Sequence, residues 1–423
     1  MRVMEMEILS TGEKIRRSRI YKGYTLKDIC GEKISVSKLS CIENDKVKAD
    51  DWILEEVAKK LNLELSYLKN GVKEQIAENI ENIGGNNDLE GYEAELLYNL
   101  EFAEQYEYHD LAFQLIHYLF KFYLDKNHLD KIQGMLLKYY DYCQKADSDA
   151  NRLIYFMDLA RYLYITGEYL QAVDYYNNVR KFMAKQVTNK MYQARSTYNE
   201  AACHIMLDNY ERAYEIAIKL IDIIDNFHDN TERANAYHMI AFLCLKLGKD
   251  NFEKYEQLSY SLYDNDNDDR ALAIYNFSLA MFEGGQKERG IEYIKNSLAC
   301  YPQNNKKGFV KFILDCIEEL TQYDMLEMAK DLCDNALNLA ISLDNIQLIQ
   351  RSYYLKSKIS QKEGKLNIAE VYINLSLDAL TKYGTRTQIF ERYIEMGDMY
   401  SKLGNVNESL KYFSLAISLQ KKM

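Results

Sequence analysis

The stretch "TGEYLQA", residues 166–172, has the features of a tight turn between two packed helices. Gly167 permits the left-handed backbone that ends a helix, Tyr169 is a large packing residue, and Ala172 is small enough for the next helix to approach closely. The same order occurs in "LDNYERA" (207–213) and "EGKLNIA" (363–369). Aligned on the turn residue, the pattern recurs at eight positions: Asn127, Gly167, Asp208, Gly248, Gly285, Asp324, Gly364 and Gly404.

These turn residues are 37 to 41 residues apart, and a steady period of this length indicates stacked helical hairpins. The pattern resembles tetratricopeptide (TPR) repeats with longer helices. The resemblance implies a right-handed TPR-like α-solenoid of eight hairpins, with an irregular ninth starting near Tyr106. We expect the alanines at the fifth position after the turn to be buried. The fit is poorest after Gly248, where that alanine is missing, and after Gly285, where Gly290 replaces it.

Composition supports an all-α protein, because the 423 residues include a single proline, Pro302. The formal net charge of -11 argues against nucleic acid as a partner of the whole chain. The charge is uneven, however: residues 1–48 contain 11 Lys+Arg and 7 Asp+Glu. A basic surplus is therefore confined to the N-terminal segment.

Cysteines and histidines give no sign of a cofactor. The eight cysteines contain no C-x-x-C pair and the six histidines have no metal-ligand spacing, so we predict reduced thiols, no metal and no cofactor. The sequence has no apolar run of 18 residues and no signal-peptide core at its start. We therefore expect a cytoplasmic protein without a membrane partner.

The chain upstream of the repeats divides into a small domain and a linker. Residues 1–71 predict five short helices, and residues 72–91 predict a linker helix over 72–83 that ends at "GGNND". The repeat domain is then 92–423. The five helices are expected at the following positions: Thr11–Tyr21, Thr25–Cys30, Ser35–Asn44, Asp51–Leu61 and a final turn at Ser66–Leu68.

The third of these helices, in "ISVSKLSCIENDK" (34–46), has two different faces. Leu39 and Ile42 have the spacing of a face that packs on a core. The opposite face then carries small polar side chains, which let a helix enter a DNA major groove and contact base edges. That face consists of Ser37, Cys41 and Asn44, flanked by Lys38 and Ser40. Thr25 and Ser35 are suitable N-caps for the second and third helices.

This stretch resembles the helix-turn-helix of XRE/Cro-type regulators, in the form found in the RRNPP family of peptide-responsive regulators. The matching positions are Ser35, Ser37, Leu39, Ser40, Ile42, Glu43 and Lys46. Two positions depart from the family pattern: Asp45 replaces a turn glycine, which an aspartate in the left-handed region can imitate, and Ser18 replaces a leucine. The resemblance implies DNA contacts from nine residues: Arg17, Thr25, Ser35, Ser37, Lys38, Ser40, Cys41, Asn44 and Lys46.

The order of the parts, a helix-turn-helix domain, a linker helix and TPR-like hairpins, also resembles the RRNPP family, and the RstA-like branch is one candidate. The resemblance implies a homodimer that binds a double-stranded DNA operator and holds a short linear signalling peptide in the concave face of the repeats. Asparagine can donate to and accept from a peptide backbone. Counting back from the turn residues gives Arg161, Asn199 and Asn276 as candidate peptide contacts. Asn235 and His238 lie one turn away from the counted positions, in the repeat between the two asparagines, and complete the candidate set.

Alternatives remain open at this point. The asparagines can equally decorate a solvated helix face, and most of the 37 tyrosines are expected to pack between hairpins. A second function is a TPR interaction protein acting on a sporulation or signalling phosphoprotein. An enzyme is not expected, because the sequence has no glycine-rich phosphate loop, nucleophile elbow or H-E-x-x-H motif.

Overall fold

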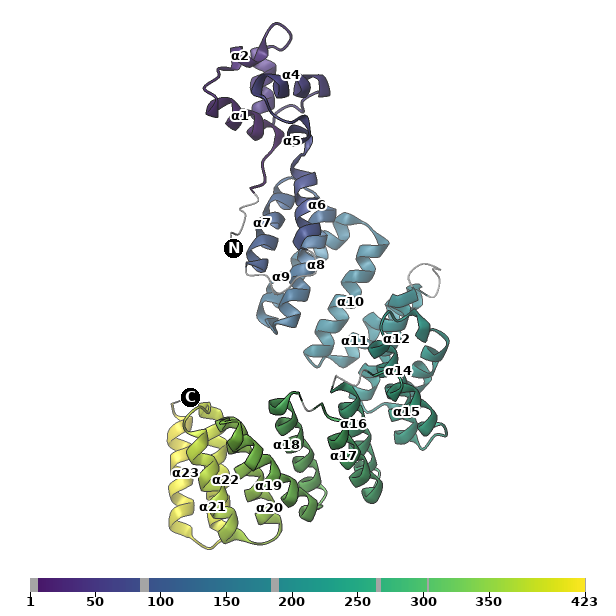
Figure 1. Ribbon diagram of the computed structural model, residues 1–423, viewed down its shortest axis with the longest axis vertical. Coiled ribbons are helices and arrows are strands. Elements are labelled where there is room, and N and C mark those ends of the chain that lie inside the picture. The colour runs from purple at the N-terminus through teal and green to yellow at the C-terminus, as the bar shows by residue number, and fades with distance from the viewer. Residues whose placement is uncertain (1–6, 84–90, 184–189, 264–267, 303, 423) are drawn as a thin grey trace. The chain divides into compact units, whose positions relative to one another are not determined.

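The computed structural model describes residues 7–83, 91–183, 190–263, 268–302 and 304–422 (Figure 1). Within these ranges the regular structure is entirely helical, from α1 to α23 with two short 3-10 segments. The predicted all-α class is confirmed. The chain divides into two compact units, Met1–Cys203 and His204–Met423, and each is described by itself.

The first unit begins with a small helical domain, here called the head. Its core is separate from that of the repeats and includes Ile15, Leu39, Ile42 and Ile53. The five helices lie within a residue or two of their predicted positions: α1 (Thr11–Tyr21), α2 (Leu26–Cys30), α3 (Val36–Glu43), α4 (Asp51–Leu61) and α5 (Leu65–Lys69). Thr25 and Ser35 are the N-caps of α2 and α3, as predicted.

Helices α6 to α12 follow the head. They are α6 (Val72–Ile83), α7 (Tyr92–Gln105), α8 (His109–Asp125), α9 (Leu129–Ala146), α10 (Asp149–Ile165), α11 (Tyr169–Met183) and α12 (Lys190–Met206). Neighbouring helices α7 and α8, α8 and α9, and α10 and α11 pack as antiparallel pairs. The segment from Tyr106 therefore forms the first helix of the Asn127 hairpin. The predicted linker helix is present, and its Ile76 and Ile80 contribute to the repeat core.

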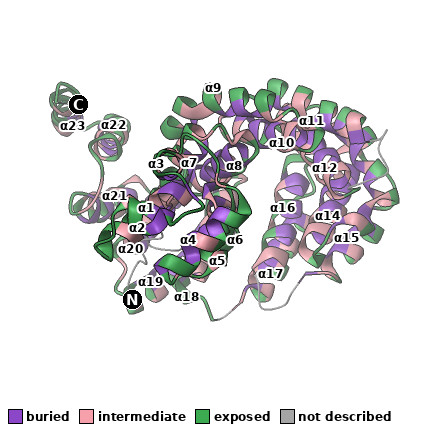
Figure 2. Ribbon diagram, turned by 90° about the horizontal axis from the view of Figure 1, so that it is seen from above, coloured by how far each residue is buried: buried purple, intermediate pink, exposed green. Residues whose placement is uncertain are grey.

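The second unit continues the hairpins. Its α-helices are α13 (Tyr210–Ala217), α14 (Asn230–Leu247), α15 (Phe252–Tyr260), α16 (Asp269–Glu283), α17 (Lys287–Cys300), α18 (Lys306–Gln322), α19 (Leu326–Ser342), α20 (Ile346–Lys362), α21 (Leu366–Leu380), α22 (Arg386–Lys402) and α23 (Val406–Gln420). From α14 onward, each even-numbered helix pairs with the next one. Buried residues alternate with exposed ones along these helices, as expected for TPR-like stacking (Figure 2).

The eight predicted turn residues all adopt the left-handed backbone conformation. Their φ angles lie between 55° and 83°, with the lowest at Asp208 and the highest at Gly167. The four alanines of the pattern are fully buried: Ala172, Ala213, Ala329 and Ala369. The repeat assignment made from spacing is therefore confirmed in the backbone and in the packing.

The two poorly fitting repeats have physical explanations. At Gly290 an added Cβ would lie 2.7 Å from the ring of Phe282, so only glycine fits there. After Gly248 the chain uses a second left-handed residue, Asn251, and α15 starts at the buried Phe252. The position of the missing alanine is consequently occupied by the exposed Glu253.

Two chemical expectations can also be compared with the structure. All eight cysteines are free thiols, and six of them are buried. In the described ranges, no helix combines the length and the apolar character needed to cross a membrane.

Candidate functional site

Helix α3 separates its packing residues from its polar residues. Leu39 and Ile42 are 0% and 2% exposed in the head core, whereas Ser37 and Asn44 are exposed. Ser40 and Cys41 are half-buried beside them. The Ser35 hydroxyl accepts the Lys38 backbone N–H at 3.1 Å, which closes the N-terminus of the helix. Six of the nine predicted DNA contacts lie on α3 or at its two caps.

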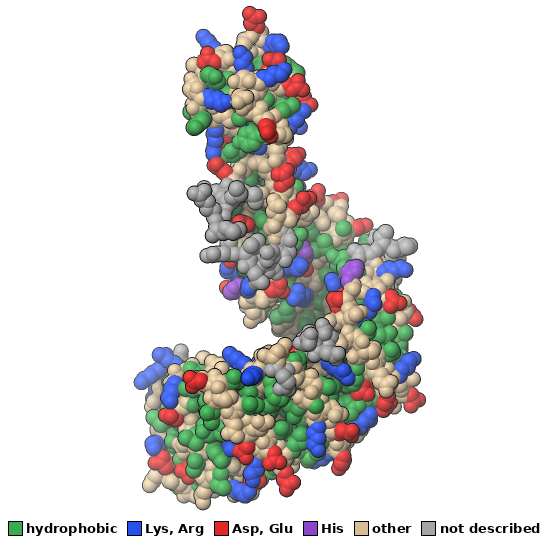
Figure 3. Space-filling view, in the orientation of Figure 1, with side chains coloured by type: hydrophobic (Ala, Val, Ile, Leu, Met, Phe, Trp, Pro, Cys, Tyr) green, Lys and Arg blue, Asp and Glu red, His purple; other side chains and the backbone are tan. Residues whose placement is uncertain are grey.

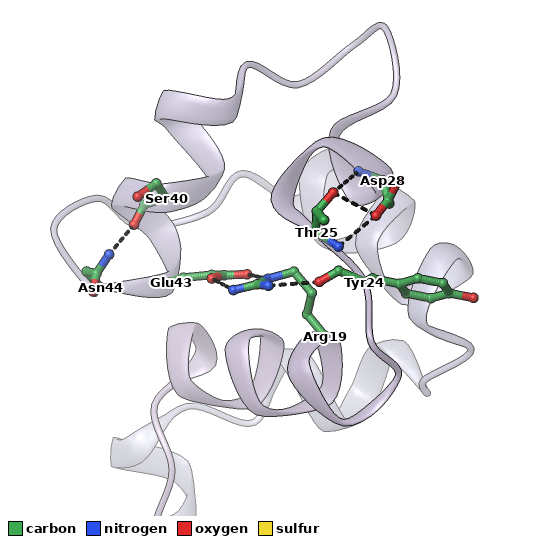
Figure 4. A network of polar contacts seen from close by, with 7 residues as sticks. All are labelled: Arg19, Tyr24, Thr25, Asp28, Ser40, Glu43 and Asn44. Carbon is green, nitrogen blue, oxygen red and sulfur yellow. Dashed lines mark hydrogen bonds and ion pairs between the residues drawn. The ribbon is translucent and has the colours of Figure 1, made fainter.

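A buried ion pair fixes α3 against α1 (Figure 4). Arg19 donates from Nε and Nη2 to the two carboxylate oxygens of Glu43, at 2.6 and 2.8 Å, and from Nη1 to the Tyr24 carbonyl at 2.9 Å. Glu43 is only 5% exposed, and its hydrogen bonds raise the pKa of Arg19. Such a bidentate pair sets the angle between the two helices. Sequence reasoning noticed Glu43 as a motif residue but missed its partner.

The turn after α3 is tied to the start of α1. Asp45 has φ 55°, so it adopts the left-handed conformation expected of a glycine substitute. Its carboxylate also accepts the Ser10 hydroxyl at 2.5 Å and the Gly12 backbone N–H at 3.2 Å, which a glycine could not do. The approach is close, because a Cβ on Gly12 would lie 2.3 Å from the Ile42 carbonyl oxygen. Ser18, the other departure, is half-buried.

Several predicted DNA contacts already have protein partners. Lys38 pairs with Asp50 at 2.8 Å, and Arg17 pairs with Glu7 at 2.7 Å. These pairs are largely exposed, so DNA phosphates can compete for the cations. Thr25 exchanges hydrogen bonds with Asp28 in a capping box, and the Asn44 amide donates to the Ser40 carbonyl at 2.7 Å (Figure 4). Lys46 is exposed just beyond α3.

The head surface carries charges of both signs. On the face visible in Figure 3, lysine and arginine side chains are interspersed with acidic ones. The exposed Ser37 lies between Ser35 and Lys38 at the N-terminal turn of α3, where backbone N–H groups favour anions. This turn is the part of α3 best suited to meet a phosphate or a base edge.

Two predicted peptide contacts lie in the first unit, on successive first helices of hairpins. Arg161 on α10 donates from Nη2 to Asp125 at 3.2 Å, and both side chains are exposed. Asn199 on α12 is half-buried, and its side chain hydrogen-bonds with Tyr176. Both residues therefore have partners that a peptide would have to replace.

The other three predicted peptide contacts lie in the second unit, on the neighbouring helices α14 and α16. Asn235 accepts the Tyr263 hydroxyl at 2.8 Å, whereas Asn276 is exposed. The ring of His238 packs on Phe277 with centroids 4.5 Å apart, and burial lowers its pKa to about 4. Its Nδ1 is buried, and no group in the described ranges hydrogen-bonds with it. The structure thus places these three residues on two helices that pack against each other.

A polar cluster in the first-unit core was not predicted from the sequence. Asp158 on α10 accepts the Tyr139 hydroxyl at 2.7 Å and lies 2.6 Å from Nδ1 of His117. Tyr139 is fully buried, and burial raises its pKa well above the usual value. The cluster links α8, α9 and α10. No local motif marks it, because its members lie 19 to 41 residues apart.

Comparison with known proteins gives matches of low sequence identity to solved structures. PlcR of Bacillus thuringiensis, solved in complex with the peptide PapR7 and DNA, is 17% identical, with 60% of this chain and 94% of that chain covered and a TM-score of 0.36. The apo quorum sensor NprR of B. thuringiensis is 15% identical, with 82% and 99% covered and a TM-score of 0.46. Aspartyl phosphate phosphatase F of Bacillus subtilis is 15% identical, with 99% and 95% covered and a TM-score of 0.40.

The chain is similar to these proteins in fold. No family model matches the sequence, and no curated protein matches it.

Proposed function

We propose that the protein is a cytoplasmic transcriptional regulator that binds a near-palindromic operator as a homodimer and responds to a short signalling peptide. The observation that carries this proposal is the geometry of α3. Its apolar residues are buried, its small polar residues face outward, and its N-terminus is capped and carries the exposed Ser37. A helix of this kind can enter the major groove and use hydroxyl, amide and ammonium groups on base edges.

The distribution of charge supports the same role. Residues 1–48 carry four more basic than acidic side chains, within a chain of net charge -11. Attraction to phosphate is therefore concentrated near α3, while the acidic remainder is repelled from DNA. Arg17 and Lys46 are the proposed phosphate contacts, and Ser37 and Lys38 the proposed base contacts.

A homodimer follows from the size of the recognition surface. One short helix reads only a few base pairs, so useful specificity needs a second copy on the same side of the duplex, about 34 Å away or a multiple of that distance. A twofold-symmetric dimer would then prefer a near-palindromic site.

The proposed peptide site uses the first helices of the hairpins. Asn276 is exposed and can donate to and accept from an extended backbone, and Asn199 can do the same if it exchanges its Tyr176 contact. Arg161 would meet a peptide carboxylate. We propose a binding protein and not an enzyme. The peptide would bind one conformation of the repeat domain more tightly than another and so shift the equilibrium between them.

The DNA-binding part can be tested without knowing the operator. Purified protein is used to select bound duplexes from a random-sequence library, and the enriched pool is sequenced. We expect a near-palindromic motif with two half-sites and a stoichiometry of two chains per duplex. Recovery of sequences no different from the starting library would contradict the proposed function.

The alternative, an interaction protein acting on a signalling phosphoprotein, would work through the hairpins alone. It therefore predicts that Ser37→Ala combined with Lys38→Ala leaves the transcriptional effects of the protein in cells unchanged. A regulator of the proposed kind loses those effects in the same variant. Transcript profiling of cells that carry the parent or the variant protein distinguishes the two roles.

A further inference from the structure

The head is attached to the repeats at two places. One is the expected covalent junction between α5 and α6, at Asn70 and Gly71. The other is the segment before α1, residues 7–10, here called the strap. Ile8 in the strap is 2% exposed and belongs to the repeat core with Ile76 and Ile80, not to the head core. From Ile8 the chain therefore runs out of the repeat core into the head, and it re-enters the repeat core in α6.

Hydrogen bonds hold the strap on α6 and α7. The Ile8 backbone N–H donates to the Tyr98 hydroxyl at 3.1 Å. Gln75 pairs with both backbone groups of Leu9: its Oε1 accepts the N–H at 3.2 Å, and its Nε2 donates to the carbonyl at 2.8 Å. A glutamine that satisfies both polar groups of one residue imitates the pairing of a neighbouring strand.

The same side chains hold the covalent junction. Gln75 Nε2 also lies 3.0 Å from each of the carbonyl oxygens of Asn70 and Gly71. Lys14 on α1 is 3% exposed and donates to the Tyr67 carbonyl at 2.9 Å and the Asn70 carbonyl at 2.6 Å. Burial lowers the pKa of Lys14, because it removes water from the ammonium group. The two carbonyl oxygens accept hydrogen bonds from the group in place of that water. Both attachments therefore meet at Gln75 and Asn70.

At its other end the strap reaches the recognition helix. Ser10 caps α1, and its hydroxyl donates to the Asp45 carboxylate that follows α3. The backbone of the strap, held by hydrogen bonds at both ends, thus connects Tyr98 and Gln75, in the repeats, with the end of α3. A single covalent linker would allow the head to rotate about it, but a second, non-covalent attachment reduces that freedom.

We propose that the strap is a second tether, which fixes the orientation of the head on α6 and α7 and passes their movements to α3. The tether itself is independent of DNA, whereas its role in regulation rests on the proposed function. A movement of the first repeat helices would then turn both heads of a dimer and change their spacing. Gln75 is the positioning residue of this device.

The single tryptophan of the chain, Trp52 on α4, provides a native probe of head motion. Its time-resolved fluorescence anisotropy in the full-length protein separates tumbling of the whole molecule from movement of the head, which falls in the nanosecond range when a segment is loose. For the parent protein we expect the slow tumbling component to dominate. Gln75→Ala should add a faster, large-amplitude component. The matched control is Gln105→Ala, an exposed glutamine on α7.

A second variant guards against misfolding. Tyr98→Phe removes only the hydroxyl that holds Ile8, and circular dichroism shows whether either variant keeps its helix content. Faster decay in Gln75→Ala or Tyr98→Phe with helix content intact supports the tether. Parent-like decay in both variants overturns it, as does the same fast component in the parent or the control. If the parent protein selects no preferred sequence from the random duplex library, that result would count against the proposed function and would leave the tether in place.

Discussion

Helix α3 of the head and the asparagines of the repeats differ in how well the local sequence predicts which side chains are exposed. In α3, Leu39 and Ile42 are buried and Ser37 and Asn44 are exposed, as the helical period predicts. In the repeats, one phrase, a tyrosine followed by an asparagine, has three outcomes. Asn99 is 2% exposed, Asn199 is half-buried and Asn276 is exposed. Identical local sequence thus does not give identical exposure.

The difference comes from what packs on each helix. The core of the head is formed by a few nearby helices. When the apolar side of α3 packs on that core, its opposite side is therefore left exposed. Each repeat helix instead contacts its own hairpin partner and the neighbouring hairpins. Asn99 accepts the Asn79 amide at 2.8 Å from α6, whereas the side chain of Asn199 contacts Tyr176 of α11. Neighbouring helices therefore decide which asparagine remains available for a ligand.

The largest effect is expected in the head. Arg19→Ala leaves the buried Glu43 without its partner, and removing one member of a buried pair costs about 3–5 kcal/mol. Urea unfolding followed by Trp52 fluorescence should show the loss. Arg17→Ala is the matched control, since its exposed pair with Glu7 is expected to contribute at most about 1 kcal/mol. Equal stabilities of the two variants would show that the head does not depend on the buried pair.

A smaller effect is expected at His238. Its pKa is lowered to about 4 by burial, whereas an unfolded histidine titrates near 6.5. As pH falls from 6.5 towards 4, the unfolded state gains a proton that the folded state does not, so the free energy of unfolding decreases by up to about 3 kcal/mol. His238→Phe should flatten this dependence.

This pH dependence of stability is measured from the denaturant midpoints of the parent protein and His238→Phe at pH 7 and pH 5, with unfolding followed by circular dichroism. Acidic groups titrate in both proteins and cancel in the difference. A stability gap that does not change with pH would mean that His238 titrates in the folded protein as it does in the unfolded chain.

The smallest effects test the asparagine comparison directly. Asn99→Ala leaves the buried Asn79 amide unpaired and should cost about 1–2 kcal/mol. Asn276→Ala, at an exposed position, should change stability by less than about 0.5 kcal/mol. Peptide calorimetry should give the opposite order, with Asn276→Ala and Asn199→Ala weakening the response. If Asn276→Ala destabilises the repeats as much as Asn99→Ala, the exposed asparagine has a structural role.

Much of the fold could be predicted because local rules fix it. The turn residues needed a left-handed backbone, and glycine, asparagine or aspartate stands at each one. The head helices followed their caps and apolar period, and even the conformation of Asp45 was expected. The domain limits at residues 71 and 91 stay predictions, although α6 packs in the repeat core.

The site could be predicted only where a contact is local. The partner of Glu43 lies 24 residues away, and the partners of Gln75 in the strap lie 66 residues away. Hydrogen bonds over such distances leave no periodic pattern in the chain. For the same reason the ion pairs of Lys38 and Arg17 could not be predicted from residue type.

Affinity for selected DNA tests most directly whether the outer face of α3 reads sequence. The parent protein, Ser37→Ala/Lys38→Ala and the phosphate-contact control Lys46→Ala are titrated with a selected duplex and an unrelated duplex at several salt concentrations. The double variant should lose roughly 1–3 kcal/mol per lost base contact on the selected duplex only. Lys46→Ala should weaken binding to both duplexes alike, and it should reduce the salt dependence of binding by about one phosphate contact. If the double variant keeps parent-like affinity and preference for the selected duplex, α3 is not the recognition helix.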